Sequence, residues 1–139
     1  MSFSNADKCT FVVDGDIATG LAMNAVAALS LSVGHLTEGI IGDDVKDADG
    51  VSHHGITSIP LPILRGDRAA LRDIVLKSAE FPDVLVVDFT EVAQSSRSYD
   101  EYTDRTGRII AAELPYIAIA VCGGKSAVNK LTGSLPLYR

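Results

Sequence analysis

Four short apolar runs, each closed by turn residues and followed by a helical pattern, constrain the fold of this chain more than any other feature. The runs are rich in β-branched side chains, which is typical of strands. An alternation of strands and helices predicts a layered α/β domain with a mainly parallel sheet. The predicted strands are Thr10–Val13, Ile56–Leu64, Val84–Phe89 and Tyr116–Cys122.

Apolar character and proline spacing predict where two of these strands lie. Val84–Phe89 is apolar almost throughout, so we expect it to be central and buried on both faces. Pro60 and Pro62 remove two backbone donors from the same side of their strand, which predicts a sheet edge. In the acidic stretch between 43 and 55, Asp49-Gly50 predicts a small hairpin.

Capping residues predict where the helices begin. Thr19 is positioned to cap the first helix, which Gly34 is expected to end. Asp67 is positioned to cap the second helix, and Ser98 with Glu101 forms a capping box before the third. A short helix is expected to follow the last strand.

Length and charge limit the class of protein. The 139 residues fit a single domain, residues 1–139, and 47% of them are hydrophobic, which suits a sheet covered on both faces. A net charge of −6 argues against a broad nucleic-acid surface. Gly20–Val33 is shorter than the ~20 apolar residues of a spanning helix, and the N-terminus does not resemble a secretory signal. We therefore expect a cytoplasmic protein without a membrane anchor.

The side chains that bind metals or act as nucleophiles are sparse. Cys9 and Cys122 both fall in apolar strand patterns, so we expect unpaired cysteines that pack as small core residues. His53 and His54 are adjacent rather than at metal-ligand spacing. No serine or cysteine stands in a nucleophile motif. The sequence therefore predicts no metal, no cofactor and no covalent catalysis.

Two loops resemble motifs that bind or transfer phosphate groups. Asp14-Gly15-Asp16 after a strand is similar to the nucleophile loop of haloacid-dehalogenase phosphatases, but Ala18 replaces the usual threonine or valine. Gly124-Lys125-Ser126 imitates the end of a P-loop, but Ile119 stands where that loop needs glycine. An anion held by backbone N–H groups at this helix start remains an open interpretation.

Polar side chains gather after the first and third predicted strands. The carboxyl ends of strands usually hold the ligands of α/β proteins, so we expect a pocket there. The cluster that follows Asp88 includes Ser95, Ser96 and Tyr102, and an ordinary loop with a helix cap is the competing interpretation. The candidate site residues are Asp14, Asn24, His53, Asp88, Thr90, Gln94 and Tyr99.

Long segments of the chain carry a family resemblance. They read ADGVSHHGITSIPLPIL, VLVVDFTEVAQSSRSYDEY and AVNKLTGSLPL. Through them the chain resembles a bacterial family of small proteins of unknown function, whose fold is related to type II peptidyl-tRNA hydrolases. The resemblance implies a three-layer α/β/α sandwich with a four-stranded, mixed, mostly parallel sheet, its last strand antiparallel, and a homodimer.

The hydrolase resemblance carries over few functional residues. Leu21 stands where the hydrolases have a lysine after the turn glycine, and Tyr116 replaces a strand threonine. The Asp88 position is retained, and Asn24 supplies an amide one residue early. Thr132, in the closing segment, joins the predicted ligand-binding residues.

Two hypotheses of function follow. The first is a pocket for a small polar ligand, with hydrolysis of an ester or amide by a water that Asp88 positions while Asn24 holds the carbonyl. The alternative is a non-catalytic homo-oligomeric or partner-binding module, which the high apolar fraction favours. Residual peptidyl-tRNA hydrolysis is a third possibility, weakened by Leu21 and the net charge of −6.

Overall fold

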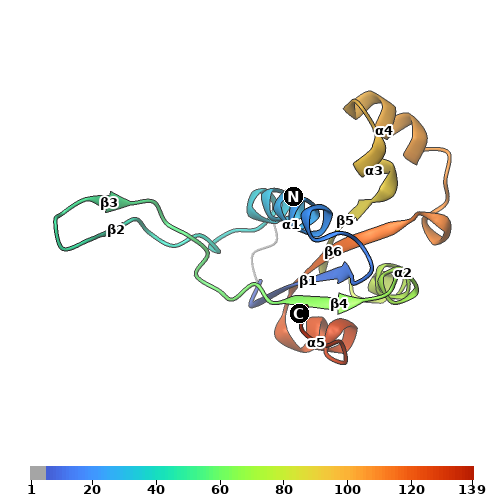
Figure 1. Cartoon of the computed structure of the whole chain (residues 1–139). Helices are drawn as coiled ribbons and strands as arrows, with labels where there is room; N and C mark the ends of the chain where they lie inside the picture. Colours follow the sequence, from blue (N-terminus) through green and yellow to red (C-terminus); the bar gives the residue numbers. More distant parts are fainter. Residues whose placement is uncertain (1–5) are drawn as a thin grey trace.

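Four strands form one mixed sheet in the computed structural model, which describes residues 6–139. The order is β4-β1-β6-β5 (Figure 1). β1 is parallel to β4, whereas β6 is antiparallel to both of its neighbours. The mixed sheet is therefore confirmed, but among its described ladders parallel pairing is limited to β1 with β4. The strands are β1 (Lys8–Asp14), β4 (Ile63–Gly66), β5 (Leu85–Thr90) and β6 (Tyr116–Gly123).

Helices cover both faces of this sheet and give it three layers (Figure 1). α1 (Thr19–Leu36) packs on one face, and α2 (Arg68–Lys77) with α5 (Lys125–Thr132) packs on the other. Side chains of β1 alternate between the two layers: Phe11 joins the α1 side and Val12 the opposite side.

α1 is long and apolar enough, by composition, to cross a membrane. Its inner side nevertheless packs into the domain core through Ala22, Ala25, Leu29 and Val33. None of its 18 residues is Asp, Glu, Lys or Arg.

Beyond the β5 edge the chain forms two short helices that project from the sheet (Figure 1). They are α3 (Glu91–Ser95) and α4 (Tyr99–Thr106). Single 3-10 turns follow α2 and precede β6; they are η1 (Ser78–Glu80) and η2 (Ala111–Glu113).

Two of the three predicted helix caps are confirmed. The Asp67 carboxylate accepts a hydrogen bond from the Ala70 backbone N–H at 2.8 Å, and Ser98 Oγ accepts one from Glu101 at 3.1 Å. The prediction for Thr19 is wrong, because Thr19 is already helical and Ala18 occupies the cap position. α1 also continues past Gly34, which has room within the helix.

The predicted central strand lies at an edge. β5 pairs with β6 alone among the described strands, whereas all eight residues of β6 are buried. Apolar residues indicate that a strand is covered by other elements, but they do not indicate which strands pair with it. The alanines of β6 make that strand less apolar than β5, so its central position was not predicted. The predicted strand Ile56–Leu64 is confirmed only in part: β4 lies at the edge of the sheet as expected, but it begins at Ile63, after both prolines.

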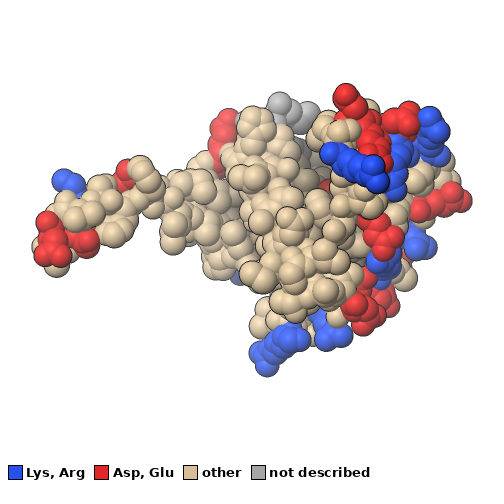
Figure 2. Space-filling view, turned by 45° about the horizontal axis from the view of Figure 1, so that its top comes forward, with Lys and Arg blue, Asp and Glu red and all other residues tan. Residues whose placement is uncertain are grey.

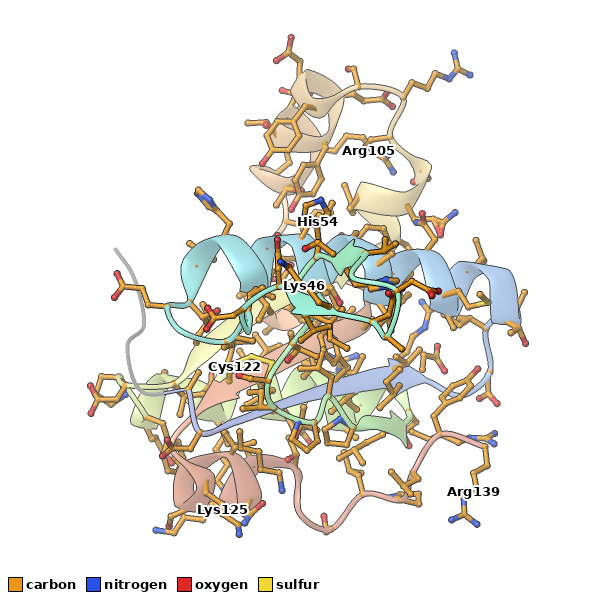
Figure 3. All side chains as sticks on the ribbon, turned by 90° about the vertical axis from the view of Figure 1, so that its left-hand side faces the viewer. Lys46, His54, Arg105, Cys122, Lys125 and Arg139 are labelled. Atoms are coloured by element: carbon orange, nitrogen blue, oxygen red, sulfur yellow. A yellow bond between two sulfur atoms is a disulfide. The ribbon has the colours of Figure 1, made fainter. Side chains whose placement is uncertain are left out.

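The acidic segment forms the predicted hairpin from β2 (Val45–Lys46) and β3 (Ser52–His53). Gly50 has φ +82°, a conformation that glycine adopts readily in such turns. We call residues 41–57 the arm, because this segment projects from the body (Figures 1 and 3). Both strands of the hairpin are exposed along their length.

Cys9 and Cys122 form a disulfide, which corrects the prediction of unpaired cysteines (Figure 3). The two residues lie opposite each other in the β1–β6 ladder, with Cα atoms 4.1 Å apart. The sequence did not reveal that its first and last strands are neighbours. The expected cytoplasmic location stays a prediction.

Candidate functional site

An open cleft of about 480 Å³ lies beside the exposed edge of the sheet. We call it the α1–α4 cleft, because one wall is α1, the floor is β5, and the other wall is formed by α3, α4 and the segment between them. Its polar lining side chains are Ser32, Asp88, Ser96, Arg97, Ser98, Tyr99 and Tyr102.

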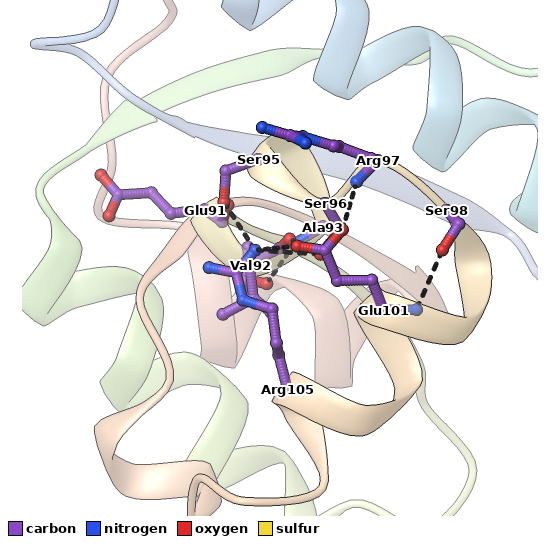
Figure 4. Close-up of polar contacts among 10 residues, drawn as sticks. Glu91, Val92, Ala93, Ser95, Ser96, Arg97, Ser98, Glu101 and Arg105 are labelled. Carbon is purple, nitrogen blue, oxygen red and sulfur yellow. Dashed lines mark hydrogen bonds and ion pairs between the residues drawn. The ribbon is translucent and has the colours of Figure 1, made fainter.

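Hydrogen bonds between α3 and α4 hold the outer wall together (Figure 4). Arg105 Nη1 donates to Ser95 Oγ and Ser96 Oγ, each at 3.1 Å. Glu101 Oε2 accepts from the Arg97 backbone N–H at 3.0 Å, which fixes the turn before α4. These bonds join α3 to α4 and fix the backbone that carries Arg97 and Tyr99, whose side chains line the cleft.

Asp88 is the carboxyl group of the cleft, and burial raises its pKa above the ordinary value of 3.8. Desolvation penalises the charged form, and no described basic group compensates it. Burial also raises the pKa of Tyr102, and the nearby charge of Asp88 adds to that increase. Perturbed carboxyls in clefts are typical of functional sites.

Arg97 supplies the basic group of the cleft, and the sequence analysis did not select it. Its guanidinium forms no ion pair with any acidic side chain of residues 6–139. By contrast, Arg105 and Arg108 pair with Glu101 and Asp104 on α4. The signal available in the sequence was its position between the serines and the tyrosines of the predicted cluster.

The raised pKa predicts how Asp88 affects stability. A carboxyl whose pKa is higher in the folded chain destabilises that state once it ionises, so its unfavourable contribution grows as pH rises above 3.8 through the folded pKa. Asp88→Asn is expected to raise the free energy of unfolding at pH 7 by less than about 1 kcal/mol, because the carboxylate still contacts solvent. The gain should vanish near pH 3. Calorimetric melting across this range, with Asp83→Asn as the exposed control, measures it; a gain independent of pH would contradict the assignment.

The cleft brings together Asp88 and Tyr99 of the predicted site and leaves Asn24 and Gln94 outside. Tyr99 is 79% exposed and packs edge-on against Tyr102, with ring centroids 5.4 Å apart. Asn24 is exposed on α1, and Gln94 is exposed on α3. Their proposed roles are predictions that the structure does not test.

Asp14 and Thr90 are buried and engaged in structural contacts. Asp14 Oδ1 accepts from the Asp16 backbone N–H at 2.9 Å, and Oδ2 accepts from Arg68 Nε at 2.9 Å. Thr90 Oγ1 accepts from the Ala93 backbone N–H and caps α3. Because β6 lies between β1 and β5, Asp14 does not line the α1–α4 cleft.

The last two predicted residues lie on other parts of the molecule. His53 is on the arm, where its Nε2 is 2.9 Å from Asp47 Oδ2; this hydrogen bond lowers the pKa of Asp47. Thr132 is buried in α5 and donates to the Val128 carbonyl at 2.8 Å. Within residues 6–139, no three His, Cys, Asp or Glu side chains are grouped to hold a metal ion.

Comparisons with known proteins give a family without an assigned function. The chain is similar over 95% of its length to the solved structure of a protein of unknown function from Agrobacterium tumefaciens strain C58, covering 97% of that chain with a TM-score of 0.86 and 20% identity. No curated protein matches. The model of the protein family of unknown function DUF2000 matches residues 7–139, so the chain belongs to the DUF2000 family.

Proposed function

We propose that the α1–α4 cleft binds a small polar molecule that carries both an anionic group and a hydrogen-bond donor. Arg97 offers a guanidinium without an acidic partner among the described residues, which suits a carboxylate or phosphate group. Asp88 accepts from the donor, and the rings of Tyr99 and Tyr102 pack against the carbon skeleton.

The observation that supports this proposal best is the unneutralised Asp88 carboxyl in an open cleft. A structural carboxylate is normally paired or hydrogen-bonded, as Asp14 is with Arg68. Asp88 is exposed at the floor of the cleft and has no such partner among the described residues; the surrounding atoms desolvate its carboxyl in part, which is a small cost to the folded state. A ligand that donates a hydrogen bond to it offsets this cost.

Hydrolysis of an ester or amide is the reaction that this arrangement supports. The Asp88 carboxylate takes a proton from a water molecule while the water oxygen attacks the carbonyl carbon. The Tyr102 hydroxyl donates to the oxygen that gains negative charge, a role assigned to Asn24 from the sequence. The carboxyl then returns the proton to the leaving group as the ester or amide bond breaks.

A thermal-shift screen of small carboxylates and phosphate esters tests binding. A ligand at 100 times its dissociation constant stabilises the protein by about 2.7 kcal/mol. Arg97→Ala is expected to abolish the shift, whereas Arg108→Ala, just after α4 and outside the cleft, should retain it. A shift that survives Arg97→Ala would contradict the proposal.

Release of p-nitrophenol from simple p-nitrophenyl esters tests hydrolysis separately. Loss of a general base typically lowers turnover by about 10²- to 10⁴-fold, so Asp88→Asn should lose turnover. The variant should still bind carboxylates through Arg97. Equal turnover in Asp88→Asn and the wild type would remove the hydrolytic step and leave the binding proposal standing.

A further inference from the structure

The outward surface of α1 is apolar although it faces solvent. Met23 is 69% exposed and Leu31 is 79% exposed. Figure 2 shows charged side chains at the arm tip, at the upper edge of the body and along its right-hand side and base, with a surface free of Lys, Arg, Asp and Glu between them. Large apolar side chains exposed on a surface without charged groups are typical of interaction sites.

Gly20, Met23, Ala27, Leu31 and Gly34 are exposed on α1 and form a narrow stripe with a symmetric spacing. At 100° per residue, they fall within about a quarter of the helix circumference. Met23 and Leu31 lie four residues before and after Ala27, and Gly20 and Gly34 lie seven residues before and after it. A two-fold axis through Ala27 would place the Met23 of one helix against the Leu31 of another.

The two glycines of the stripe have no role in the packing of the described chain. A Cβ added at Gly20 or Gly34 would meet no atom within 4 Å. Glycine inside a helix costs about 1 kcal/mol relative to alanine. Their place on the outward stripe fits the close approach of a second helix.

The arm lies next to this surface and carries apolar side chains of its own. Ile41, Val45, Val51 and Ile56 are each more than half exposed. A two-stranded hairpin without further support is marginally stable in water, so the arm gains from a second surface. Figures 1 and 3 show it projecting away from the sheet, roughly across the direction of α1.

We propose that a second copy of this chain covers the α1 stripe and is held by the arm, with the two α1 helices antiparallel about Ala27. An uncharged, symmetrically spaced stripe is complementary to itself, as a two-fold interface requires. An 18-residue helix is about 27 Å long and 10 Å wide, so α1 alone offers on the order of 300 Å². A stable interface buries about 800 Å² on each partner, so the two arms supply the remainder.

Sedimentation of the full chain at micromolar concentration tests the proposal. The wild type is expected to be a dimer and Leu31→Glu a monomer with an unchanged far-ultraviolet spectrum. Ile110→Glu is the matched control, because Ile110 is 65% exposed outside the stripe. A monomeric wild type, or a dimer that withstands Leu31→Glu, would overturn the proposal.

Cross-linking tests the position of the axis. Ala27→Cys is expected to give a disulfide-linked dimer on oxidation, because residues on a two-fold axis approach their own copies. Leu76→Cys, at an exposed position on α2, should stay uncross-linked. Failure of Ala27→Cys to cross-link would refute a two-fold axis through Ala27. If the protein is instead a monomer that binds phosphatidylcholine vesicles through α1, a membrane covers the stripe and the dimer proposal is wrong.

Discussion

Arg68→Ala is expected to lower the free energy of unfolding by about 2–3 kcal/mol. Arg68 is the first residue of α2; its Nε donates to the Asp14 carboxylate, and its Nη2 donates to Glu91 at the start of α3. Asp14 is 4% exposed, so removing the guanidinium leaves a buried carboxylate with one backbone donor. Breaking a fully buried pair costs about 3–5 kcal/mol, and the partial exposure of Arg68 reduces that figure.

Urea unfolding of three variants separates this pair from the surface contact. Glu91→Ala should cost less than about 1 kcal/mol, because Glu91 is exposed. Adding Asp14→Asn to Arg68→Ala should recover part of the loss, since the amide has no charge to leave uncompensated. If Arg68→Ala and Glu91→Ala cost the same, the buried pair does not stabilise the fold as described.

Local signals in the sequence predicted which helices, strands and turns form better than they predicted which strands lie side by side. The Asp-Gly hairpin and the caps at Asp67 and Ser98 depend on residues a few positions apart, and these predictions are confirmed. The order of the strands depends on contacts between distant segments. For this reason Val84–Phe89 was expected at the centre, and the pairing of Cys9 with Cys122 was missed.

The candidate site shows the same difference between local signals and contacts of distant segments. Asp88 and Tyr99 were selected from one continuous polar segment, and both line the cleft. Asn24 was selected because the hydrolase resemblance implies an amide near its position, but α1 lines the cleft with Ala28, Leu29 and Ser32 instead. Which part of α1 borders the cleft depends on where α3 and α4 lie beyond β5, and the sequence pattern does not reveal that.

Gly55→Ala is expected to weaken self-association at least tenfold while leaving the body stable. A Cβ at Gly55 would lie 1.8 Å from the Gly42 carbonyl oxygen, and backbone atoms cannot rotate aside. The base of the arm must open and strain the hydrogen bonds there, such as Gly42 N–H to the Ile56 carbonyl at 2.8 Å. A tenfold change corresponds to about 1.4 kcal/mol of binding free energy.

Gly42→Ala is the matched control for the arm, because its Cβ would meet the Ile56 carbonyl at an ordinary 3.6 Å. Hydrogen exchange at Gly42 N–H reports whether the arm base has opened, independently of association. We expect faster exchange and weaker dimerisation in Gly55→Ala, and wild-type values for both in Gly42→Ala. Faster exchange with undiminished dimerisation would exclude the arm from the interface. The α1 stripe would then be the whole contact, although it offers less than half the area that a stable dimer needs.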